Sequence, residues 1–453
     1  MSISSNAAPA LPNSAQALSE PEANPAGQPL VAVEDLSVHF RTKRGTVHAV
    51  DGVNFEIGHG ETVGLVGETG CGKSVTARSF LRLVPTPPAR YASGRILFRP
   101  NQMCGHCDGA GCGACNAAGR VPSSCTGCKG NGCADCEGSG RETLDLLRIP
   151  HRELQRIRGE RVAMIFQDPA LALNPVLTVR EQVGEVFYQH RSAELLEEAG
   201  LSGAQFLIRR AARGRSTSTE RALLALPLLR SRRRRLVRAV EERVTTALAE
   251  TRIANPRKIL DSYPHELSGG MKQRVMIAQA LACAPDLLIA DEPTTALDVT
   301  IQARILDLIR ELQERHHTAV LYISHDLSLI RDVCDRLMVM YAGQLVEGGS
   351  TKQIFTDSLH PYTDGLLAAI PTGTQARGSL KAIKGTVPEL VDPPSQCRFH
   401  TRCPHAGPVC ATATPEWATH RPPDHHAACF LYDNADTIGV PATDMPTPDR
   451  SAS

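Results

Sequence analysis

No stretch of this 453-residue sequence approaches the run of about 18 consecutive apolar residues that a membrane-spanning helix requires. Residues 1–29 lack the basic start and the apolar run of a secretory signal peptide. Charge of one sign is also missing, because 49 lysines and arginines face 48 acidic residues. We therefore expect a cytosolic chain that does not span a membrane and has no overall basic field for binding nucleic acid.

Cysteine, by contrast, is plentiful. Of 15 cysteines, eight lie within residues 104–136 and four within residues 397–429, while Cys71, Cys283 and Cys334 are scattered. Cytosolic thiols are kept reduced. Clusters of cysteine in such a chain therefore indicate metal ligands rather than disulfides.

The order of apolar segments predicts an α/β fold. Short apolar runs typical of strands lie at 31–40, 53–67, 161–167, 285–293, 318–326 and 335–349, with helical periodicity between them, notably at 301–316. Strands of this kind separated by helices predict a parallel sheet that is covered on both faces. Polar, Pro-containing composition predicts disorder for residues 1–29 and 436–453.

Two segments interrupt this pattern. The cysteine block with its Gly-rich flanks, residues 99–141, separates GRILF from TLDLL, which can still pair as a hairpin across it. Residues 191–250 interleave many arginines with Leu, Ala and Val, which predicts basic amphipathic helices inserted into a helical region. Such a face is either simply solvated or in contact with lipid headgroups or an acidic surface.

A phosphate-binding loop follows one of the predicted strands. The segment GETGCGKS comprises Gly67, Glu68, Thr69, Gly70, Cys71, Gly72, Lys73 and Ser74. In such a loop the glycines let backbone N–H groups cradle phosphates, while the lysine reaches the β and γ oxygens. The Ser74 hydroxyl is a ligand for Mg²⁺. We therefore expect ATP and Mg²⁺ to bind here.

Two acidic residues end the strand LLIADEP. Asp291 is placed to hold Mg²⁺ through water, and Glu292 to orient or deprotonate the attacking water. Tandem acids after a strand also occur as helix caps, which is the alternative interpretation.

The segment LSGGMKQR adds a second anion-binding turn, formed by Ser268, Gly269 and Gly270 at the start of a helix. Together with FQDP, TTALD and ISHD, it resembles the ATP-binding cassette (ABC) family over residues 30–350. The resemblance implies an ABC nucleotide-binding domain, with a RecA-like core, an antiparallel β subdomain and a helical subdomain. It also implies that two cassettes pair head to tail, so that the Ser268 turn meets a γ-phosphate held by the partner's loop.

The same resemblance implies roles for single residues. Gln167 in FQDP is a nucleotide-sensing residue and Mg²⁺ ligand, Asp298 in TTALD belongs to the nucleotide site, and His325 in ISHD contacts the γ-phosphate and positions Glu292. Phe40, upstream, is the candidate for stacking on adenine. A phenylalanine at a strand end is equally often a core residue.

The resemblance can be narrowed. KSVTARSFL, FQDPALALNPVLTVREQ, SYPHELSGGMKQRVMIAQAL, DEPTTALDVTIQARIL and LHPYTDGLLAAIP resemble the ATPase subunits of oligopeptide and dipeptide permeases, especially the D type. This implies a sister ATPase, two transmembrane permease subunits, an extracytoplasmic substrate-binding protein and a peripheral position at the cytoplasmic face of the cell membrane. Nickel importers share much of the signature, so uptake of nickel or a metal chelate is the alternative.

The resemblance continues into a C-terminal lobe at residues 351–435. There CRFHTRCPHAGPVC and a later cysteine match the family's cluster, which in this chain is Cys397, Cys403, Cys410 and Cys429. Four thiolates suit either a 4Fe–4S cluster or tetrahedral Zn²⁺. Relatives in the family favour the iron–sulfur cluster. The remaining alternative is four unliganded thiols that are buried as small apolar groups.

The cysteine block reads as four successive copies of CxxCxGxG, with Ala117 replacing one glycine. Four CxxC pairs provide two four-sulfur sites, and we expect Zn²⁺ in both. The block resembles the zinc-binding domain of DnaJ-type chaperones, although its copies run back to back. That resemblance pairs the outer cysteines Cys104, Cys107, Cys133 and Cys136, and the inner cysteines Cys112, Cys115, Cys125 and Cys128.

Two other classes of protein fit less well. Soluble cassette ATPases that act on ribosomes or DNA carry two cassettes or a long coiled coil, whereas this sequence has one phosphate loop and no heptad run. A chaperone-like thiol or zinc module would not need the complete set of hydrolytic motifs. The sequence therefore predicts an ATP-hydrolysing subunit of a peptide importer.

Overall fold

The computed structural model describes residues 28–103, 120–124, 141–201, 227–294, 298–370, 383–421 and 424–432. All eight cysteines of the inserted block lie outside these residues. Residues 1–27, residues 433–453 and the central part of the Arg-rich segment, residues 202–226, lie outside them too, so the predicted disorder of the two ends falls almost wholly outside the described residues.

A parallel sheet forms the core, as the alternation of strands and helices predicts. Its strands are β3 (Thr62–Val66), β8 (Val162–Ile165), β9 (Leu287–Asp291), β10 (Ala319–Ser324) and β11 (Arg336–Tyr341), which lie side by side in the order β11-β3-β10-β9-β8. Every residue of β3, β9 and β10 is buried, which explains their nearly continuous apolar sequences.

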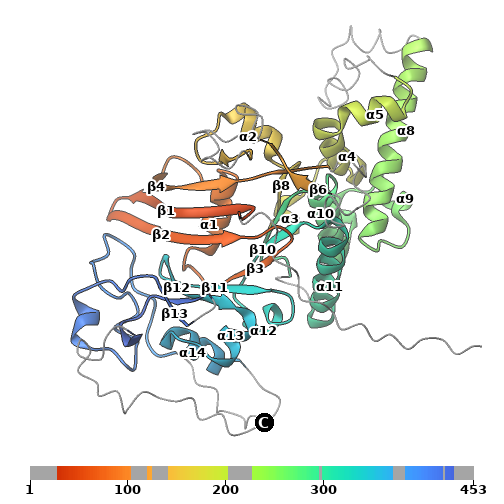
Figure 1. The fold of residues 1–453 in the computed structure, drawn as a ribbon. Coiled ribbons are helices and arrows are strands. Elements are labelled where there is room, and N and C mark those ends of the chain that lie inside the picture. Colours follow the sequence, from red (N-terminus) through yellow and green to blue (C-terminus); the bar gives the residue numbers. More distant parts are fainter. Residues whose placement is uncertain are drawn as a thin grey trace, which may run out of the picture.

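An antiparallel sheet packs beside this core (Figure 1). It contains β1 (Val31–Thr42), β2 (Gly45–Ile57), β4 (Ala89–Phe98) and β7 (Leu144–Asp145) in the order β2-β1-β4-β7. Leu97 lies opposite Asp145 and Phe98 opposite Leu144, so GRILF and TLDLL do pair across the cysteine block. Two further short strands, β5 (Asn101–Met103) and β6 (Arg120–Pro122), pair with each other at the base of the block.

A helical region projects from the sheets around the long helix α8, at the upper right of Figure 1. It comprises α4 (Val179–His190), α5 (Ser192–Glu198), α8 (Pro227–Glu250), α9 (Pro256–Ile259) and α10 (Gly269–Leu281). Leu236, Val240, Val244 and Leu248 follow one face of α8 and are buried, whereas Arg233, Arg234, Arg235 and Arg238 are exposed. Within the Arg-rich segment, α8 is therefore an amphipathic helix on which these four arginines face solvent.

The remaining helices cover the core sheet or connect its strands. They are α1 (Lys73–Phe80), α2 (His151–Ile157), α3 (Pro169–Ala172), α11 (Val299–His316), α12 (Leu327–Ile330), α13 (Thr351–Thr356) and α14 (Pro361–Ala368), with 3₁₀ turns at Pro264–Glu266, Pro408–Ala411 and Phe430–Tyr432. Apolar side chains of α10 and α11 pack on one face of the sheet, and α1 lies on the other.

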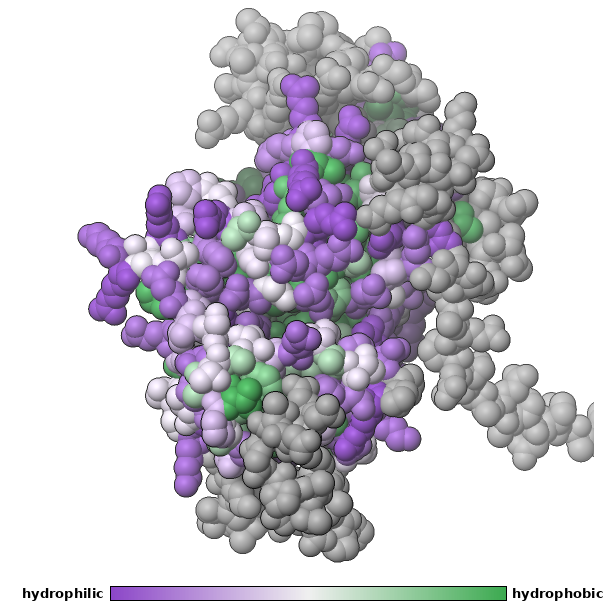
Figure 2. Space-filling model, turned by 60° about the vertical axis from the view of Figure 1, so that its left-hand side comes forward, coloured by the Kyte–Doolittle hydropathy of each residue, from purple (hydrophilic) through white to green (hydrophobic). Residues whose placement is uncertain are grey.

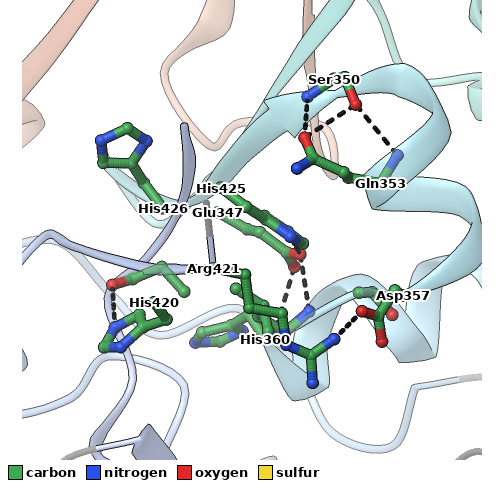
Figure 3. Close-up of polar contacts among 12 residues, drawn as sticks. Glu347, Ser350, Gln353, Asp357, His360, His420, Arg421, His425 and His426 are labelled. Atoms are coloured by element: carbon green, nitrogen blue, oxygen red, sulfur yellow. Dashed lines mark hydrogen bonds and ion pairs between the residues drawn. The ribbon is translucent and has the colours of Figure 1, made fainter. Parts of the chain in front are cut away.

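The C-terminal residues extend the core sheet, which the sequence does not predict. After β12 (Gln344–Ser350), the hairpin of β13 (Ala418–Arg421) and β14 (His425–Ala427) adds to its edge, giving the order β13-β14-β12-β11-β3-β10-β9-β8. Glu347 of β12 is completely buried beneath this hairpin. Its carboxylate accepts hydrogen bonds from the backbone N–H groups of Leu359 and His360 at 2.7 and 2.9 Å, and it contacts His425 Nε2 at 2.8 Å (Figure 3).

The surface seen in Figure 2 is mostly hydrophilic, with apolar areas that are small and separated. None of the helices within the described residues is both long enough and apolar enough to cross a membrane.

Candidate nucleotide and metal sites

Four neighbouring strands bring the predicted catalytic residues together at one edge of the sheet, the edge formed by the carboxyl ends of its parallel strands. The parallel strands β3, β10, β9 and β8 lie in register, with Val66 beside Ser324, Ile323 beside Asp291, and Ala290 beside Ile165. Because parallel strands end on the same side, the segments that follow them converge there. These segments are the phosphate loop, ISHD, DEP and FQDP, which are separated by up to 258 residues in the sequence.

The phosphate loop has a conformation that requires glycine at two positions. Gly67 and Gly72 have φ of 151° and 109°. A Cβ atom at Gly67 would lie 2.1 Å from the carbonyl oxygen of Met340, and one at Gly72 would lie 2.4 Å from that of Ala49. Gly67, Cys71, Gly72 and Lys73 are buried, whereas Thr69 and Gly70 form an exposed tip. The loop therefore packs tightly underneath while its tip faces solvent.

Lys73 holds the loop from within. Its Nζ donates hydrogen bonds to the carbonyl oxygens of Gly67 at 2.7 Å and Glu68 at 3.0 Å, and its side chain is 5% exposed. The ammonium group is therefore fixed at the loop and placed to share its charge with phosphate oxygens. Cys71, 3.7 Å from Nζ, is a buried thiol whose pKa is raised by that burial.

Ser74 and Asp291 form an oxygen pair suited to Mg²⁺. Ser74 Oγ donates to Asp291 Oδ1 at 2.9 Å, and Asp291 is completely buried. The second carboxylate oxygen, Oδ2, is buried without a hydrogen-bond partner and lies 4.0 Å from the guanidinium of Arg78. Burial raises the pKa of Asp291, and the adjacent Glu292 carboxylate raises it further. A hard divalent cation with oxygen ligands would satisfy this oxygen and favour the charged carboxylate, so the residues fit Mg²⁺.

Glu292, Gln167 and His325 lie in direct contact. Gln167 Nε2 donates to Glu292 Oε2 at 2.7 Å, and His325 Nδ1 lies 3.0 Å from Glu292 Oε1. The Glu292 N–H donates to the carbonyl oxygen of Ile323 at 3.0 Å, which ties this residue to the end of β10. Its φ of 46° lies in the left-handed region, which costs about 1 kcal/mol or more for a residue with a side chain. The carboxylate is therefore held in one orientation by its neighbours.

The second anion-binding turn lies on the surface. Ser268 caps α10 by accepting a hydrogen bond from the N–H of Met271 at 3.4 Å, and Gly269 and Gly270 begin the helix. Ser268 and Gly269 are exposed, and within the described residues no hydrogen bond joins this turn to the phosphate loop. Asp298 is the N-cap residue of α11 and is also exposed, while residues 295–297 before it lie outside the described part of the chain.

Phe40 lies on β1 and is partly buried against the apolar core, so its structural position agrees with both interpretations of its role.

A group of possible metal ligands lies on the neighbouring residues of β1 and β2. His39 Nε2 and His48 Nδ1 lie 3.6 and 3.5 Å from the carboxylate of Asp51. This is the one group of three possible metal-ligand atoms mutually within 4.8 Å that the described residues contain. The Asp51 carboxylate already forms an ion pair with Arg398, so its negative charge is balanced without a metal cation.

The four C-terminal cysteines surround one small cavity. Cys397, Cys403, Cys410 and Cys429 line a space of about 20 Å³ together with His360, Phe399 and His405. They form no disulfides. Burial, to which the neighbouring thiols add a smaller effect, raises the pKa of Cys403 to about 11 and that of Cys429 to about 12. Thiols in such a place become thiolates when a metal cation offsets the charge.

The sequence did not reveal how the C-terminal residues contact the phosphate loop. Arg402 forms a two-point ion pair with Glu68, from Nη1 to Oε2 at 2.7 Å and from Nη2 to Oε1 at 2.9 Å. The Glu68 N–H donates to Tyr362 Oη at 2.9 Å. These contacts span 334 and 294 residues, and no local pattern indicates which of many charged residues will pair over such a distance.

A second unpredicted contact joins the helix after LSGG to the acidic segment. Gln273 is 1% exposed, and its side-chain amide donates to the carbonyl oxygen of Pro293. The turn at Ser268 and the carboxylate of Glu292 therefore lie on segments that are linked by a buried hydrogen bond.

Comparison with known proteins places the chain in a family. The family described as "ABC transporter" matches residues 50–111 and 138–295, and the family "Oligopeptide/dipeptide transporter, C-terminal region" matches residues 346–410. The chain is similar to the "Probable peptide ABC transporter ATP-binding protein y4tR" of Sinorhizobium fredii, with 38% identity over 410 residues, covering 90% of this chain and 97% of the relative.

Two further relatives carry more specific names. The "Dipeptide transport ATP-binding protein DppD" of Bacillus subtilis is 37% identical over 404 residues, covering 89% of this chain and 95% of the relative. The "Oligopeptide transport ATP-binding protein OppD" of Salmonella typhimurium is 38% identical over 401 residues, covering 88% and 93% respectively.

Proposed function

Because the chain belongs to the oligopeptide and dipeptide branch of the ABC transporter ATP-binding proteins, which are ATPases, we propose that it powers the import of oligopeptides or dipeptides. The observation that carries the proposal is the convergence of the phosphate loop, Asp291, Glu292, Gln167 and His325 at one edge of the sheet. The names of the relatives favour peptide over nickel or a metal chelate as cargo.

Each residue at this edge has a proposed part in hydrolysis. The loop N–H groups and Lys73 bind the phosphates of ATP, and Ser74 and Asp291 hold Mg²⁺. When bound, Mg²⁺ offsets the negative charge that develops on the phosphate oxygens. Glu292 orients the attacking water and accepts its proton, while Gln167 and His325 keep the carboxylate turned toward it. Phe40 provides a surface for the adenine ring.

The exposed turn of Ser268, Gly269 and Gly270 supports a composite site. We propose that this turn completes the ATP site of a sister ATPase, that the sister's turn completes the site of this chain, and that Asp298 belongs to the nucleotide site. Closure of the two cassettes on ATP then drives two transmembrane permease subunits, which receive cargo from an extracytoplasmic binding protein. The chain would lie at the cytoplasmic face of the membrane without entering it.

Reconstitution of the transporter tests this function. The isolated chain, with its monomeric state checked during the assay, should hydrolyse ATP slowly, and it should accelerate when combined with the sister ATPase and the permease subunits. Uptake into vesicles should require an oligopeptide or dipeptide on the binding-protein side. A monomer that hydrolyses ATP as fast as the complex would refute the composite site, and uptake of nickel but not peptide would refute the cargo.

We also propose that the four C-terminal cysteines hold a structural 4Fe–4S cluster. The four cysteines line one cavity and form no disulfides, so their sulfurs are available together as ligands. The 20 Å³ cavity alone would suit a single ion. We favour the cluster because four cysteine thiolates are its usual ligand set and because the resemblance to the peptide-permease ATPases implies it.

Colour and metal content test the cluster. Anaerobically purified protein should be brown with broad absorption near about 400 nm, and Cys403→Ser should lose the colour. Cys283→Ser removes a buried cysteine outside this site and is the matched control, which should remain brown. Colourless wild-type protein with one zinc per C-terminal site would reject iron.

For the inserted block, we propose two zinc ions bound by its eight cysteines. Two observations support an insertion at this position. The ABC transporter family match omits residues 112–137, and the strands β4 and β7 pair on either side of the block.

A further inference from the structure

We propose that Arg402 is a positioning residue for the phosphate loop, through which the four-cysteine site controls the affinity for ATP. The first half of this proposal rests on the contacts of Arg402 with Glu68. The second half rests also on the metal centre proposed above for Cys397, Cys403, Cys410 and Cys429.

Glu68 occupies a central position in the loop. Its backbone carbonyl oxygen accepts hydrogen bonds from Lys73 Nζ at 3.0 Å and from the N–H of Cys71 at 3.3 Å. Its N–H donates to Tyr362 Oη, and its carboxylate forms the two-point pair with Arg402. A displacement of Glu68 would therefore move both the lysine that meets the phosphates and the turn that cradles them.

Arg402 is itself held rigidly. Its side chain is 4% exposed, and its guanidinium lies 5.6 Å from the ring centre of Tyr341 and 6.0 Å from that of Phe399. Nε donates to the carbonyl oxygen of Lys384 at 3.0 Å, and Nη1 lies 3.3 Å from Tyr341 Oη. An arginine and a carboxylate joined by two parallel hydrogen bonds form one of the stronger polar contacts in proteins.

The pair also affects the charge at the nucleotide site. Glu68 places a carboxylate on a loop whose ligand is a polyanion, and an unpaired carboxylate there would repel phosphate. Arg402 neutralises this carboxylate from the side of the C-terminal segment. Loss of the arginine should therefore weaken nucleotide binding both by loosening the loop and by uncovering a negative charge.

The backbone of Arg402 is continuous with the four-cysteine site. The N–H groups of Arg402 and Cys403 both donate to the carbonyl oxygen of Phe399, at 2.9 and 3.0 Å, so the two residues share one turn. Cys403 lines the cysteine cavity on one side of this turn, and Arg402 reaches Glu68 on the other. A metal centre that fixes Cys403 thereby fixes the position from which Arg402 extends.

Binding of a fluorescent, non-hydrolysable ATP analogue to the purified full-length chain tests the role of Arg402. We expect Arg402→Gln to raise the Kd about tenfold, and Arg402→Lys to give an intermediate value because it keeps the charge but not the two-point geometry. Glu68→Gln combined with Arg402→Gln should recover part of the loss, because the uncovered charge is gone. In the assembled transporter, Arg402→Gln should raise KM more than it lowers kcat.

Arg421→Gln is the matched control. It removes another arginine of the C-terminal segment that pairs with a carboxylate, Asp357, but at an exposed position on β13. This variant should bind the analogue as the wild type does. An unchanged Kd for Arg402→Gln, or an equal rise for Arg421→Gln, would overturn the positioning role.

Removal of the metal tests the coupling. Iron and zinc are measured per chain, and analogue binding is compared before and after anaerobic chelation in the wild type and in Arg402→Gln. We expect chelation to weaken binding in the wild type to the level of Arg402→Gln, and to have little further effect in that variant. Equal weakening in both proteins would refute coupling through Arg402. If the wild type contains no metal in this segment, the proposed metal centre and the coupling are both wrong, and the Kd values alone decide the positioning role.

Discussion

Gln167 donates a hydrogen bond of 2.7 Å from its side-chain amide to the carboxylate of Glu292. The two residues follow the ends of neighbouring strands, β8 and β9, although 125 positions separate them in the sequence. His325 contacts the other carboxylate oxygen. Contacts within the chain itself therefore fix the orientation of the Glu292 side chain. Exchange of its carboxylate for an amide should therefore change its chemistry more than its position.

Glu292→Gln should reduce steady-state phosphate release by at least about a hundredfold, because the group that accepts the proton of water is lost. Affinity for ATP should not change, since the phosphate loop and its lysine remain. Phosphate release and nucleotide affinity are measured in the assembled transporter. Glu314→Gln on the exposed side of α11 is the control and should leave both values unchanged. Hydrolysis near the wild-type rate in Glu292→Gln would remove Glu292 from the mechanism.

Replacement of residues 102–139 by a short Gly-Ser linker should preserve ATP binding and hydrolysis. The pairing of Phe98 with Leu144 lies outside the replaced segment, and so does every residue assigned to ATP. Metal analysis should show about two zinc ions fewer per chain than in the intact protein, as two four-thiolate sites require. Equal zinc contents would contradict the zinc sites, and a folded but inactive deletion would contradict an accessory role.

Glu347→Ala should strongly destabilise the fold. The substitution leaves two buried N–H groups and the imidazole of His425 without their acceptor, and it weakens the attachment of β14 to the core sheet. Removing one partner from such a buried arrangement costs about 3 to 5 kcal/mol. The midpoint of urea unfolding measures the loss. Glu314→Ala, at an exposed ion pair, should cost less than about 0.5 kcal/mol, and a similar small cost for Glu347→Ala would show that its contacts contribute little.

His59 should make stability depend on pH. Burial, together with the smaller effects of the Arg141 and Arg99 charges, lowers its pKa from 6.5 to about 4. Between these values the unfolded chain binds more protons than the folded chain, so stability falls as the pH falls from 6.5 toward 4. Between pH 6.5 and about pH 5, the wild type should therefore lose about 1 kcal/mol more of its free energy of unfolding than His59→Gln does.

Unfolding by urea across this pH range, in wild type and variant, measures the difference. His151→Gln removes an exposed histidine and should leave the pH dependence in place. Identical slopes for wild type and His59→Gln would exclude His59 as a source of the effect.

The sequence by itself determined the α/β class, the family resemblance and the residues proposed to surround ATP. These features depend on short segments, because glycines in GETGCGKS, acids at the end of LLIADEP and the turn in LSGG each act through the strand or helix beside them. Once the strands are parallel, their ends must meet at one edge. The contact of Gln167 and His325 with Glu292 is therefore the kind of arrangement that sequence reasoning can anticipate.

Only the tertiary structure decided how the C-terminal segment joins the ATPase. The strand β14 has three residues, too few for an alternating pattern to identify its partner at the edge of the core sheet. The pairing of Arg402 with Glu68 is one of very many combinations among 49 basic and 48 acidic residues, and burial by Tyr341 and Phe399 selects it. Local patterns specify local structure, whereas a contact across 334 residues depends on which surfaces the folded chain brings together.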